Sequence, residues 1–518
     1  MTDLIKIKEY NKKLLQVEKG NTLNLKNKTK AQFKIGLGFA SEYKYAIHTI
    51  GFQYIYFKIN EYEDFFCQRF YYPDLIDLHK RSKIPVLTQE TNSPINKMEL
   101  LLFSLNYEGN YLKLLDLLNL SGIQLNKAKR GFPILIAGGI CPTYNPEPLK
   151  NIFDAFVIGE AEDVLPKILK AYKNKLKKHD FLKKISSVQG VYVPGYNTKV
   201  KKAQTASLNT NLTSHITTPF SKFPNTLFLE IQRGCQHNCK FCILSHSFKE
   251  ARMRSINKIL KIAKKQISFC KNIRLISPSS CDHPNAKKIY EKLKELGFSI
   301  KSGSQRADRL IQKKDILKFV KNDKLTIAPE TASANLRNKI NKQIKNKQIY
   351  DCVRLAAKNK YKTIQFFFII GFSNETSKDR QEIIKMVKKT REILDSNNSE
   401  KTTIELTINC HIKKPHTDFE RDAQLKVDKY LIHINKIKSA LKKIKIDYMD
   451  ETLLLLEAIL VRGSEKEGML LEKIYSALGI NPKRKDIENL INTDKYFTKI
   501  RGKLPWSFIN LRPSKKTK

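Results

Sequence analysis

The stretch that governs this chain reads Arg233-Gly-Cys-Gln-His-Asn-Cys-Lys-Phe-Cys242, and it follows the apolar run Leu227-Phe-Leu-Glu-Ile231. Its three cysteines, Cys235, Cys239 and Cys242, have the spacing C-x3-C-x2-C. Placed directly behind a strand, that spacing lets one loop present three thiolates to one face of an iron–sulfur cube. Such clusters are normally held by four cysteines. Three cysteines therefore leave one iron open for a substrate or a cofactor.

Zinc is the competing interpretation of the same loop. A structural zinc ion takes four ligands and is usually completed by a second cysteine pair. No C-x2-C pair occurs elsewhere in the sequence, and His237 and His246 are the nearby candidates for a fourth ligand. The ligand count favours an iron–sulfur cluster.

Length, charge and cysteine usage bound the class of protein. The chain has 518 residues, enough for two to four domains, and its 96 Lys+Arg against 50 Asp+Glu leave a net charge of +46. That charge suits a polyanionic partner, although lysines spread over nearly the whole chain are also typical of a proteome-wide composition bias. The six other cysteines are scattered and suit a reducing cytosol. Because the N-terminus lacks a signal-peptide core and no run is long enough to span a membrane, we expect a cytoplasmic protein without a membrane partner.

The N-terminal half alternates short apolar strands with helices. After a lead-in over residues 1–30, this alternation predicts a doubly wound parallel α/β sheet over residues 31–175. Ligands bind beyond the carboxyl ends of such strands. The residues expected at that edge are Ser41, Ser104, Gly138, Gly139 and Glu160. The expected strands are 34–39, 100–105, 133–139 and 155–159, and the expected helices are 43–58 and 107–120.

The second half repeats the order of strand and helix after a linker predicted over residues 176–222. Six strand–helix units over residues 223–425 predict a partial (βα)6 barrel, in which chemistry takes place where the strands end. The six expected strands are 227–231, 271–277, 298–303, 325–330, 363–370 and 403–410. Residues 426–518 are predicted to be a small helical region, with helices at 427–444 and 450–460 and a basic tail at 512–518.

The cysteine loop, with the aromatic Phe241 before its last cysteine, resembles the signature of the radical S-adenosylmethionine (SAM) superfamily. The resemblance implies a 4Fe–4S cluster on Cys235, Cys239 and Cys242, with SAM bound at the open iron. It further implies reductive cleavage of SAM to a 5′-deoxyadenosyl radical that abstracts hydrogen from a substrate, and an electron donor such as ferredoxin or flavodoxin. The cofactors supply this chemistry, and the protein supplies binding and orientation.

Other strand ends resemble the same family. The segment Ala328-Pro-Glu-Thr-Ala-Ser333 resembles its fourth-strand signature, in which the glutamate, here Glu330, reaches SAM. Ser304 and Arg306 match a Ser-x-Arg after the third strand, which implies contacts with the SAM ribose and carboxylate, since Arg binds carboxylates bidentately. Gly371 lies in a turn that resembles the one packing on adenine. The alternative is that these charged residues form a structural salt-bridge network.

The N-terminal half resembles the cobalamin-binding-like domain that precedes the radical domain in a little-characterised subgroup of the superfamily. The resemblance rests on IAGGICPTYNPEP (136–148) and FVIGEAED (156–163). A cobalamin domain usually has Asp-x-His-x-x-Gly, whereas this chain has Ala46-Ile-His48-Thr-Ile-Gly51 and lacks the carboxylate that would orient the histidine. We therefore expect this domain to shape the substrate site rather than to hold cobalt.

Three hypotheses of function remain. The first is a radical SAM enzyme acting on an unidentified substrate, with tRNA or another macromolecule as one substrate class. The second is a cobalamin-dependent radical SAM methyltransferase. The third is a non-catalytic nucleic-acid-binding protein with a structural metal site. Methylthio-transferring relatives are disfavoured, because their second cluster needs three cysteines in an N-terminal domain that here has Cys67 and Cys141.

Overall fold

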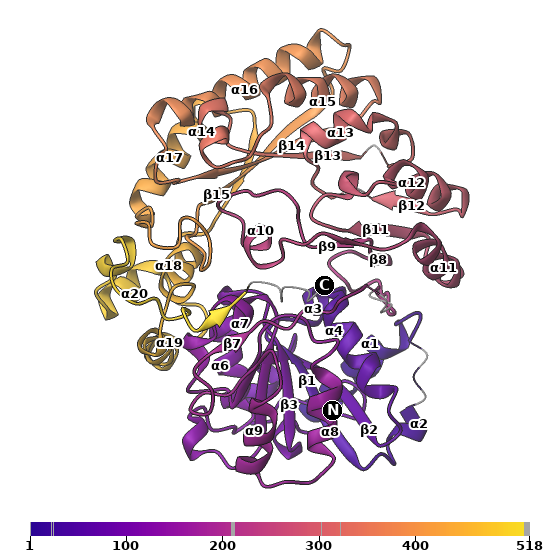
Figure 1. The fold of residues 1–518 in the computed structure, drawn as a ribbon, viewed down its shortest axis with the longest axis vertical. Helices are drawn as coiled ribbons and strands as arrows, with labels where there is room; N and C mark the ends of the chain where they lie inside the picture. Colours follow the sequence, from indigo (N-terminus) through magenta and orange to yellow (C-terminus); the bar gives the residue numbers. More distant parts are fainter. Residues whose placement is uncertain are drawn as a thin grey trace, which may run out of the picture. The chain divides into compact units, whose positions relative to one another are not determined.

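The structure is a computed structural model, and it describes residues 2–21, 23, 25–208, 213–301, 303–321 and 323–511. The chain divides into two compact units, whose elements are labelled in Figure 1. Unit 1 comprises Met1–Leu227, Ile459–Ile491 and Gly502–Lys518, and unit 2 comprises Phe228–Ala458 and Asn492–Arg501. The chain therefore enters unit 2 twice and returns to unit 1 twice.

A six-stranded sheet forms the centre of unit 1, in the order β2-β1-β3-β4-β5-β6. The first five of these strands run parallel, and β6 pairs antiparallel with β5. The strands are β1 (Phe33–Phe39), β2 (Phe65–Tyr71), β3 (Leu100–Ser104), β4 (Ile134–Gly138), β5 (Ala155–Val157) and β6 (Val191–Tyr192). The predicted parallel α/β sheet is confirmed.

The alternation within β1 shows why the strand is buried on both faces of this sheet. Its odd-numbered residues from Phe33 to Phe39 are buried together with the apolar sides of three helices, α4 (Ile50–Asn60), α8 (Leu165–Tyr172) and α9 (Lys178–Ser186). Side chains of the opposite parity point to the other face, where β1 has glycine at positions 36 and 38. A Cβ at Gly38 would lie 2.4 Å from the Phe70 ring, so glycine makes room for that aromatic side chain.

Unit 1 differs from the prediction in the edge strand β2, which was missed. The strand contains Gln68 and Arg69, whose polarity hides its burial in the sequence. Arg69 is fully buried because its guanidinium pairs with Glu18 at 2.9 Å and with Glu90 at 2.7 Å. A buried charge is tolerated when it is paired and hydrogen-bonded in this way.

Two further segments depart from expectation. The helix predicted over 43–58 is divided into α3 (Tyr43–Ala46) and α4, because Thr49 adopts an extended conformation between them. The predicted linker 176–222 contains helix α9 and the short strand β7 (Val200–Lys201), neither of which was expected; strand β6 falls in residues 190–194, which the sequence indicates as a short strand.

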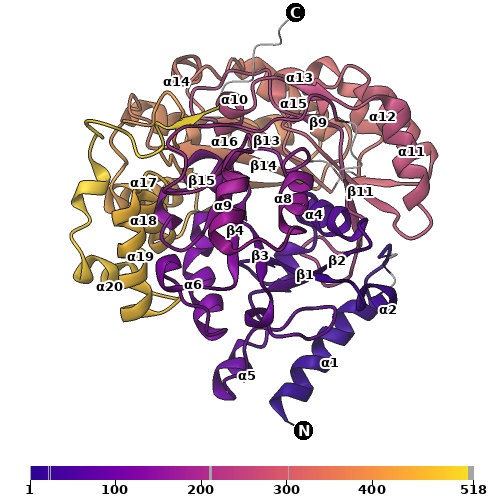
Figure 2. The ribbon, with the colours of Figure 1, turned by 60° about the horizontal axis from the view of Figure 1, so that its bottom comes forward.

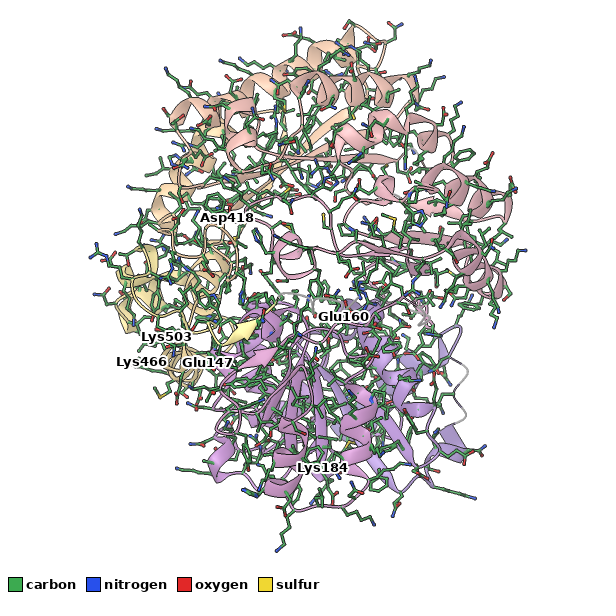
Figure 3. The ribbon with its side chains drawn as sticks, viewed as in Figure 1. Glu147, Glu160, Lys184, Asp418, Lys466 and Lys503 are labelled. Carbon is green, nitrogen blue, oxygen red and sulfur yellow. The ribbon has the colours of Figure 1, made fainter. Side chains whose placement is uncertain are left out.

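The remaining elements of unit 1 come from both ends of the chain. From the N-terminal part come α1 (Asp3–Gln16), α2 (Leu25–Lys28), α5 (Ile76–Arg81), α6 (Tyr111–Leu120) and α7 (Ile140–Tyr144), and from the C-terminal part come α19 (Glu465–Leu478), α20 (Arg484–Leu490) and β17 (Ile509–Asn510). Helix α19 packs on α6, as Figure 2 shows, and Tyr475 Oη donates to Asp116 at 3.0 Å. In Figure 3, Glu147 and Lys466 mark the same region. Part of the predicted C-terminal helical region thus packs on helix α6 of the N-terminal domain.

Unit 2 has two parallel sheets, in the orders β12-β11-β8 and β13-β14-β15-β16. A parallel bridge between Gln305 and Ile327 joins the segment after β12 to β13. The strands are β8 (Thr226–Glu230), β11 (Asn272–Ile276), β12 (Ser299–Lys301), β13 (Lys324–Glu330), β14 (Thr363–Ile370), β15 (Thr403–Cys410) and β16 (Lys445–Tyr448). The helices along this series are α11 (Ile256–Gln266), α12 (Ala286–Glu295), α13 (Ala307–Gln312), α14 (Ala334–Lys339), α15 (Asn346–Lys358), α16 (Ser377–Asp395), α17 (Val427–Ala440) and α18 (Glu451–Leu460). The partial βα barrel is confirmed.

Strand β16 adds a seventh strand that was not predicted. It has four largely exposed residues at the edge of its sheet, too few to show an apolar alternation in sequence. Over the described ranges, no helix combines the length and the apolarity that crossing a membrane requires. The basic tail predicted at 512–518 lies outside the described residues.

Candidate active site

The cysteine loop begins where the first barrel strand ends. Strand β8 continues into β9 (Gln232–Arg233), which pairs antiparallel with β10 (Arg252–Met253) and so closes the base of the loop. At Gly234, φ is +82°, and a Cβ would lie 2.1 Å from the Glu250 carbonyl oxygen. Cys235 N donates to Phe248 O at 2.9 Å. These contacts hold the loop against its own return segment, and glycine is the residue that permits the approach.

The far end of the loop is held by a serine. Ser245, in helix α10 (Ile243–Ser247), donates its hydroxyl to Cys239 O at 2.8 Å and to Cys242 O at 2.9 Å. The loop therefore has a defined backbone between its first and its last cysteine.

The three thiols differ in their surroundings. Cys235 and Cys239 are buried and Cys242 is partly exposed. Burial raises the pKa of Cys235, and a hydrogen bond from the backbone of His237 acts in the opposite direction. Burial likewise raises the pKa of Cys239, and the nearby charges of Lys342 and Arg306 lower it. Burial is the larger effect and favours the neutral thiols, while the backbone donor and the two cations are groups that stabilise sulfur once a metal has made it anionic.

Two cations lie near Cys239, Arg306 in the segment after β12 and Lys342 in the segment after α14. Arg306 donates from Nη1 to the Cys239 sulfur at 3.9 Å, while its Nε and Nη2 each donate to Asp308 at 3.1 Å. Lys342 is buried and donates to Glu330 at 2.8 Å. The predicted site residues Arg306, Glu330 and Cys239 are thus brought together. Arg306 and Glu330 are also each ion-paired, as the salt-bridge alternative requires.

Glu330 has an uncommon backbone conformation. Its φ is +66°, and the pairing of β13 with β14 shifts register between Ile327 and Glu330. A non-glycine residue with positive φ costs free energy and is frequent at functional sites. Glu330 is the last residue of β13, so this conformation lies at the strand end where its carboxylate meets Lys342.

Phe241 and Gly371 belong to a neighbouring apolar group. The Phe241 ring packs on Phe372, with ring centroids 5.8 Å apart, beside Leu336, Ile340 and Phe419. Gly371 directly precedes Phe372 and has φ of +94°. Its N–H donates to the Glu375 carboxylate, and its carbonyl accepts from Lys413 at 2.8 Å. Ser304, by contrast, is exposed at the surface.

The histidines considered as extra ligands are engaged with other residues. His237 Nε2 lies 2.7 Å from Asp282, whose side chain is fully buried and also faces Arg309 at 3.2 Å. His246 Nε2 lies 3.2 Å from Lys240 O. Among the described residues, no three His, Cys, Asp or Glu side chains converge on a point that could hold a single metal ion. An iron–sulfur cube does not require such a point, because each thiolate binds its own iron.

Sequence reasoning assigned no role to Lys342, Asp308 or Asp282. Lys342 lies twelve residues after Glu330, and Asp308 is two residues from Arg306. A charged residue downstream of a motif residue was therefore the available signal, but its partner could not be identified without the fold.

The carboxyl edge of the sheet in unit 1 is covered by its own chain near β5. Gly159 pairs with Ala203, and the Glu160 carboxylate accepts from Thr205 N at 2.9 Å. His48 lies edge-to-face against Phe223, with ring centroids 5.0 Å apart, and its Nδ1 is 3.2 Å from Lys44 O. Ala46, at the position of the orienting aspartate, is fully buried. A histidine that binds a metal can also make such a contact with a backbone carbonyl, so the difference from a cobalamin ligand is the missing carboxylate at Ala46.

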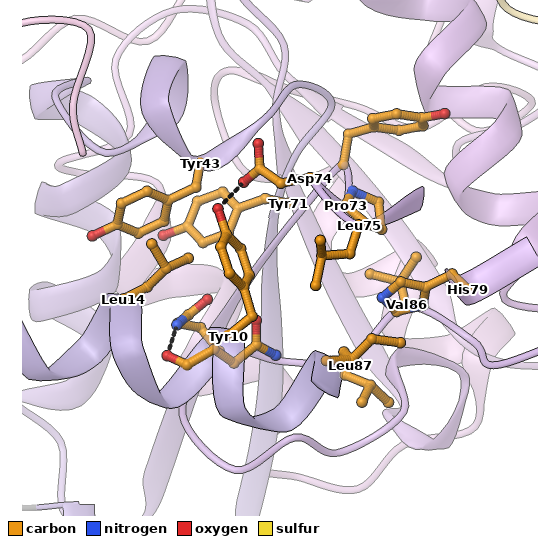
Figure 4. Close-up of a pocket in the computed structure, with 14 residues that line it drawn as sticks. Tyr10, Leu14, Tyr43, Tyr71, Pro73, Asp74, Leu75, His79, Val86 and Leu87 are labelled. Carbon is orange, nitrogen blue, oxygen red and sulfur yellow. Dashed lines mark hydrogen bonds between the residues drawn. The ribbon is translucent and has the colours of Figure 1, made fainter. Parts of the chain in front are cut away.

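A small pocket lies at the carboxyl end of β2, between α1 and α5 (Figure 4). Its volume is about 30 Å³, and Tyr10 Oη donates to Asp74 at 3.1 Å on its wall. Burial raises the pKa of Asp74. A space of this size takes roughly one water molecule, so the pocket does not hold a cofactor.

A loop with three cysteines at the end of the first strand of a partial βα barrel, with acidic and basic residues at the following strand ends, defines the class of radical SAM proteins. Residues 229–387 match the family described as the radical SAM superfamily, and residues 51–194 match the family described as radical SAM proteins, N-terminal. The chain belongs to the radical SAM superfamily.

Two known proteins illustrate the relationship. An uncharacterized protein of Methanocaldococcus jannaschii is 29% identical over 434 residues, which cover 82% of this chain and 90% of that protein. The cobalamin-dependent SAM radical enzyme OxsB, solved with aqua-cobalamin and SAM bound, is 13% identical with a TM-score of 0.53, over 89% of this chain and 74% of OxsB. At that identity, the likeness to OxsB concerns the fold.

Membership defines the class of activity and the cofactors. The chain is an enzyme, and its family implies a 4Fe–4S cluster and SAM. Radical SAM enzymes generally need a reductant such as ferredoxin or flavodoxin. Three thiols from one loop, two of them buried, with a backbone donor and two cations nearby, fit such a cluster.

Proposed function

We propose that this chain cleaves SAM reductively at a cluster held by Cys235, Cys239 and Cys242. Its substrate is unidentified, and tRNA or another macromolecule is one candidate class. When bound, the cluster would supply the reductive cleavage of SAM to methionine and a 5′-deoxyadenosyl radical. The observation that supports the proposal is the Arg306 guanidinium, 3.9 Å from the Cys239 sulfur at the mouth of the barrel. The Arg306 cation thus lies beside a sulfur that would become anionic when it binds a cluster.

The residues around the loop have distinct proposed roles. The three thiolates bind three irons and leave the fourth for SAM. Arg306 and Glu330 bind the carboxylate and the amino group of SAM, and their existing partners, Asp308 and Lys342, hold both side chains in place. Phe241 and the turn at Gly371 pack beside the adenine, and Ser304 binds the ribose.

The first prediction tests the cluster. Anaerobically reconstituted protein should bind about four irons per chain, and replacing Cys235, Cys239 or Cys242 by alanine should abolish SAM cleavage. Iron content, the visible spectrum and 5′-deoxyadenosine release measure this. Cys270→Ala is the matched control, because Cys270 is buried outside the loop. One zinc per chain with no visible absorbance would sink the proposal and favour the structural metal site.

The second candidate is a cobalamin-dependent methyltransferase. What favours it is that OxsB, whose fold extends over both units of this chain, is cobalamin-dependent. Because Ala46 replaces the carboxylate that would orient His48, we expect that His48 does not ligate cobalt. His48→Ala should keep SAM cleavage unchanged. Stoichiometric cobalamin with a histidine-nitrogen signal in the cobalt(II) paramagnetic spectrum would overturn this expectation.

A further inference from the structure

A groove of about 510 Å³ lies at the amino ends of strands β1, β3 and β4 in unit 1. This is the sheet edge opposite to the one at Glu160; Figure 3 marks Glu160 and Lys184 at the two ends of unit 1. The groove is lined by residues that precede or begin the strands and by residues where α8 passes into α9. None of its lining residues belongs to the cysteine site.

Aromatic rings form much of the groove wall. Phe33 and Tyr172 meet edge-to-face with centroids 5.6 Å apart, and Tyr172 meets Phe181 at 5.8 Å. Phe132 is 59% exposed, the largest exposed fraction among the exposed large apolar side chains of the described part of the chain. An exposed ring beside other rings offers a flat surface on which another planar group can stack.

Uncompensated positive charge borders these rings. Lys34, Lys97 and Lys175 are exposed, and within the described ranges no carboxylate forms an ion pair with any of the three. The Lys175 ammonium lies 5.8 Å from the centroid of the Phe33 ring. Glu99 is the one acidic residue among the described groove residues, and its carboxylate accepts a hydrogen bond from Tyr172 Oη at 3.1 Å.

The adjoining segment extends this basic border. Residues 173–184 read KNKLKKHDFLKK, with six lysines and one aspartate. The combination of aromatic surface and lysines is found where proteins bind single strands, since every base can stack on an aromatic ring and the phosphates bind the cations.

We propose that this groove binds single-stranded nucleic acid, with a base stacked on Phe132 and phosphates on Lys34, Lys97 and Lys175. An acidic peptide would use the lysines but would leave the exposed ring without a stacking partner, which favours nucleic acid. The site requires neither the cluster nor SAM, so it stands or falls independently of the proposed function.

The test measures binding of a fluorescein-labelled 12-mer oligouridylate and of its oligothymidylate counterpart by fluorescence anisotropy, at several salt concentrations. K34Q/K97Q/K175Q should weaken binding about tenfold or more and reduce the slope of log affinity against log salt by roughly two to three. F132A should weaken binding about tenfold, as the loss of one base–aromatic stack predicts. The RNA and DNA arms show which sugar is preferred.

The matched control removes the same charge elsewhere. K261Q/K264Q/K265Q lies on α11, where these three lysines are exposed, and it should change affinity by less than about twofold. Crosslinking of the parent protein to a 4-thiouridine-containing strand should label peptides spanning 130–134 or 172–178. Equal losses in the groove and control variants, or tight binding of a 12-mer polyglutamate that is insensitive to F132A, would overturn the proposal.

Discussion

Cys239 is the residue on which several parts of the sequence converge. Its sulfur accepts from Arg306, which follows β12, and it lies within the field of Lys342, which follows α14. Both cations are buried and each has its own carboxylate partner. Because each cation is already paired with a carboxylate, it can face a thiolate or a ligand without leaving an uncompensated buried charge.

Removal of these side chains should weaken SAM binding. Arg306→Ala and Glu330→Ala should each cost roughly 1.5 to 3 kcal/mol, the range typical of a hydrogen bond to a charged group. Equilibrium binding of SAM to the reconstituted enzyme measures the change. If both variants bind SAM like the parent but unfold more easily, the two residues belong to a structural salt-bridge network.

Glu375 should make the stability of unit 2 dependent on pH. Burial raises its pKa from 4.5 to about 7, and its side chain is 2% exposed. Between those two pH values the folded state binds more protons than the unfolded state, so stability falls as pH rises. The fall should be on the order of 3 kcal/mol.

Replacement by glutamine tests this expectation, because Gln retains an acceptor for the Gly371 N–H. In Glu375→Gln, denaturant unfolding curves at pH 5 and pH 8 should differ less than in the parent. Glu392→Gln, at an exposed position of α16, is the control. An unchanged pH dependence in Glu375→Gln would assign the effect to another group.

At the level of secondary structure, the antiparallel pairing of β9 with β10 closes the base of the cysteine loop. This pairing brings residues 248–250 against the start of the cysteine loop. Ser245 of α10 bonds to the far end of that loop. These contacts fix the backbone of the loop at both ends, and Gly234 allows the closest approach.

Gly234→Ala should lower the iron content and SAM cleavage of the reconstituted protein. The new methyl would meet the Glu250 carbonyl at 2.1 Å, so the loop would have to move. Gly297→Ala is a matched control, since its φ of +91° imposes similar backbone strain and no atom lies within 4 Å of the added Cβ. Equal iron loss in both variants would show that strain, and not the close approach, matters.

Over the whole molecule, unit 1 is completed by the C-terminal part of the chain. Helix α19 packs on α6 and on the 3-10 helix η4 (Glu147–Leu149), and Asn145 donates to the carbonyls of Val461 and Gly463 at 3.1 and 2.8 Å. Unit 1 therefore acquires part of its packing only after the barrel strands have been synthesised.

Gly468→Ala should destabilise unit 1 even though alanine favours an isolated helix by roughly 1 kcal/mol. A Cβ at this position would lie 2.0 Å from the Pro148 carbonyl oxygen, so α19 could not pack as closely. Amide hydrogen exchange in α6 and α19 should speed up. Ser476→Ala, on an exposed position of the same helix, should leave exchange unchanged; faster exchange in that variant too would contradict this explanation.

Features that depend on local spacing could be predicted from the amino-acid sequence alone. The C-x3-C-x2-C loop, the alternation of strands with helices and the motifs at strand ends can be recognised from neighbours along the chain, so the sheet of unit 1, the partial barrel of unit 2 and the superfamily could be predicted. The assignment of individual residues to the cluster and to SAM stays a prediction.

Which distant residues are in contact could be seen only in the folded chain. Arg69 could be recognised as part of a buried strand only once Glu18 and Glu90 were placed beside it, and β16 only once it paired with β15. The approach of Lys342 to Cys239 and the packing of α19 on α6 likewise depend on contacts between segments far apart in sequence, which no local pattern encodes.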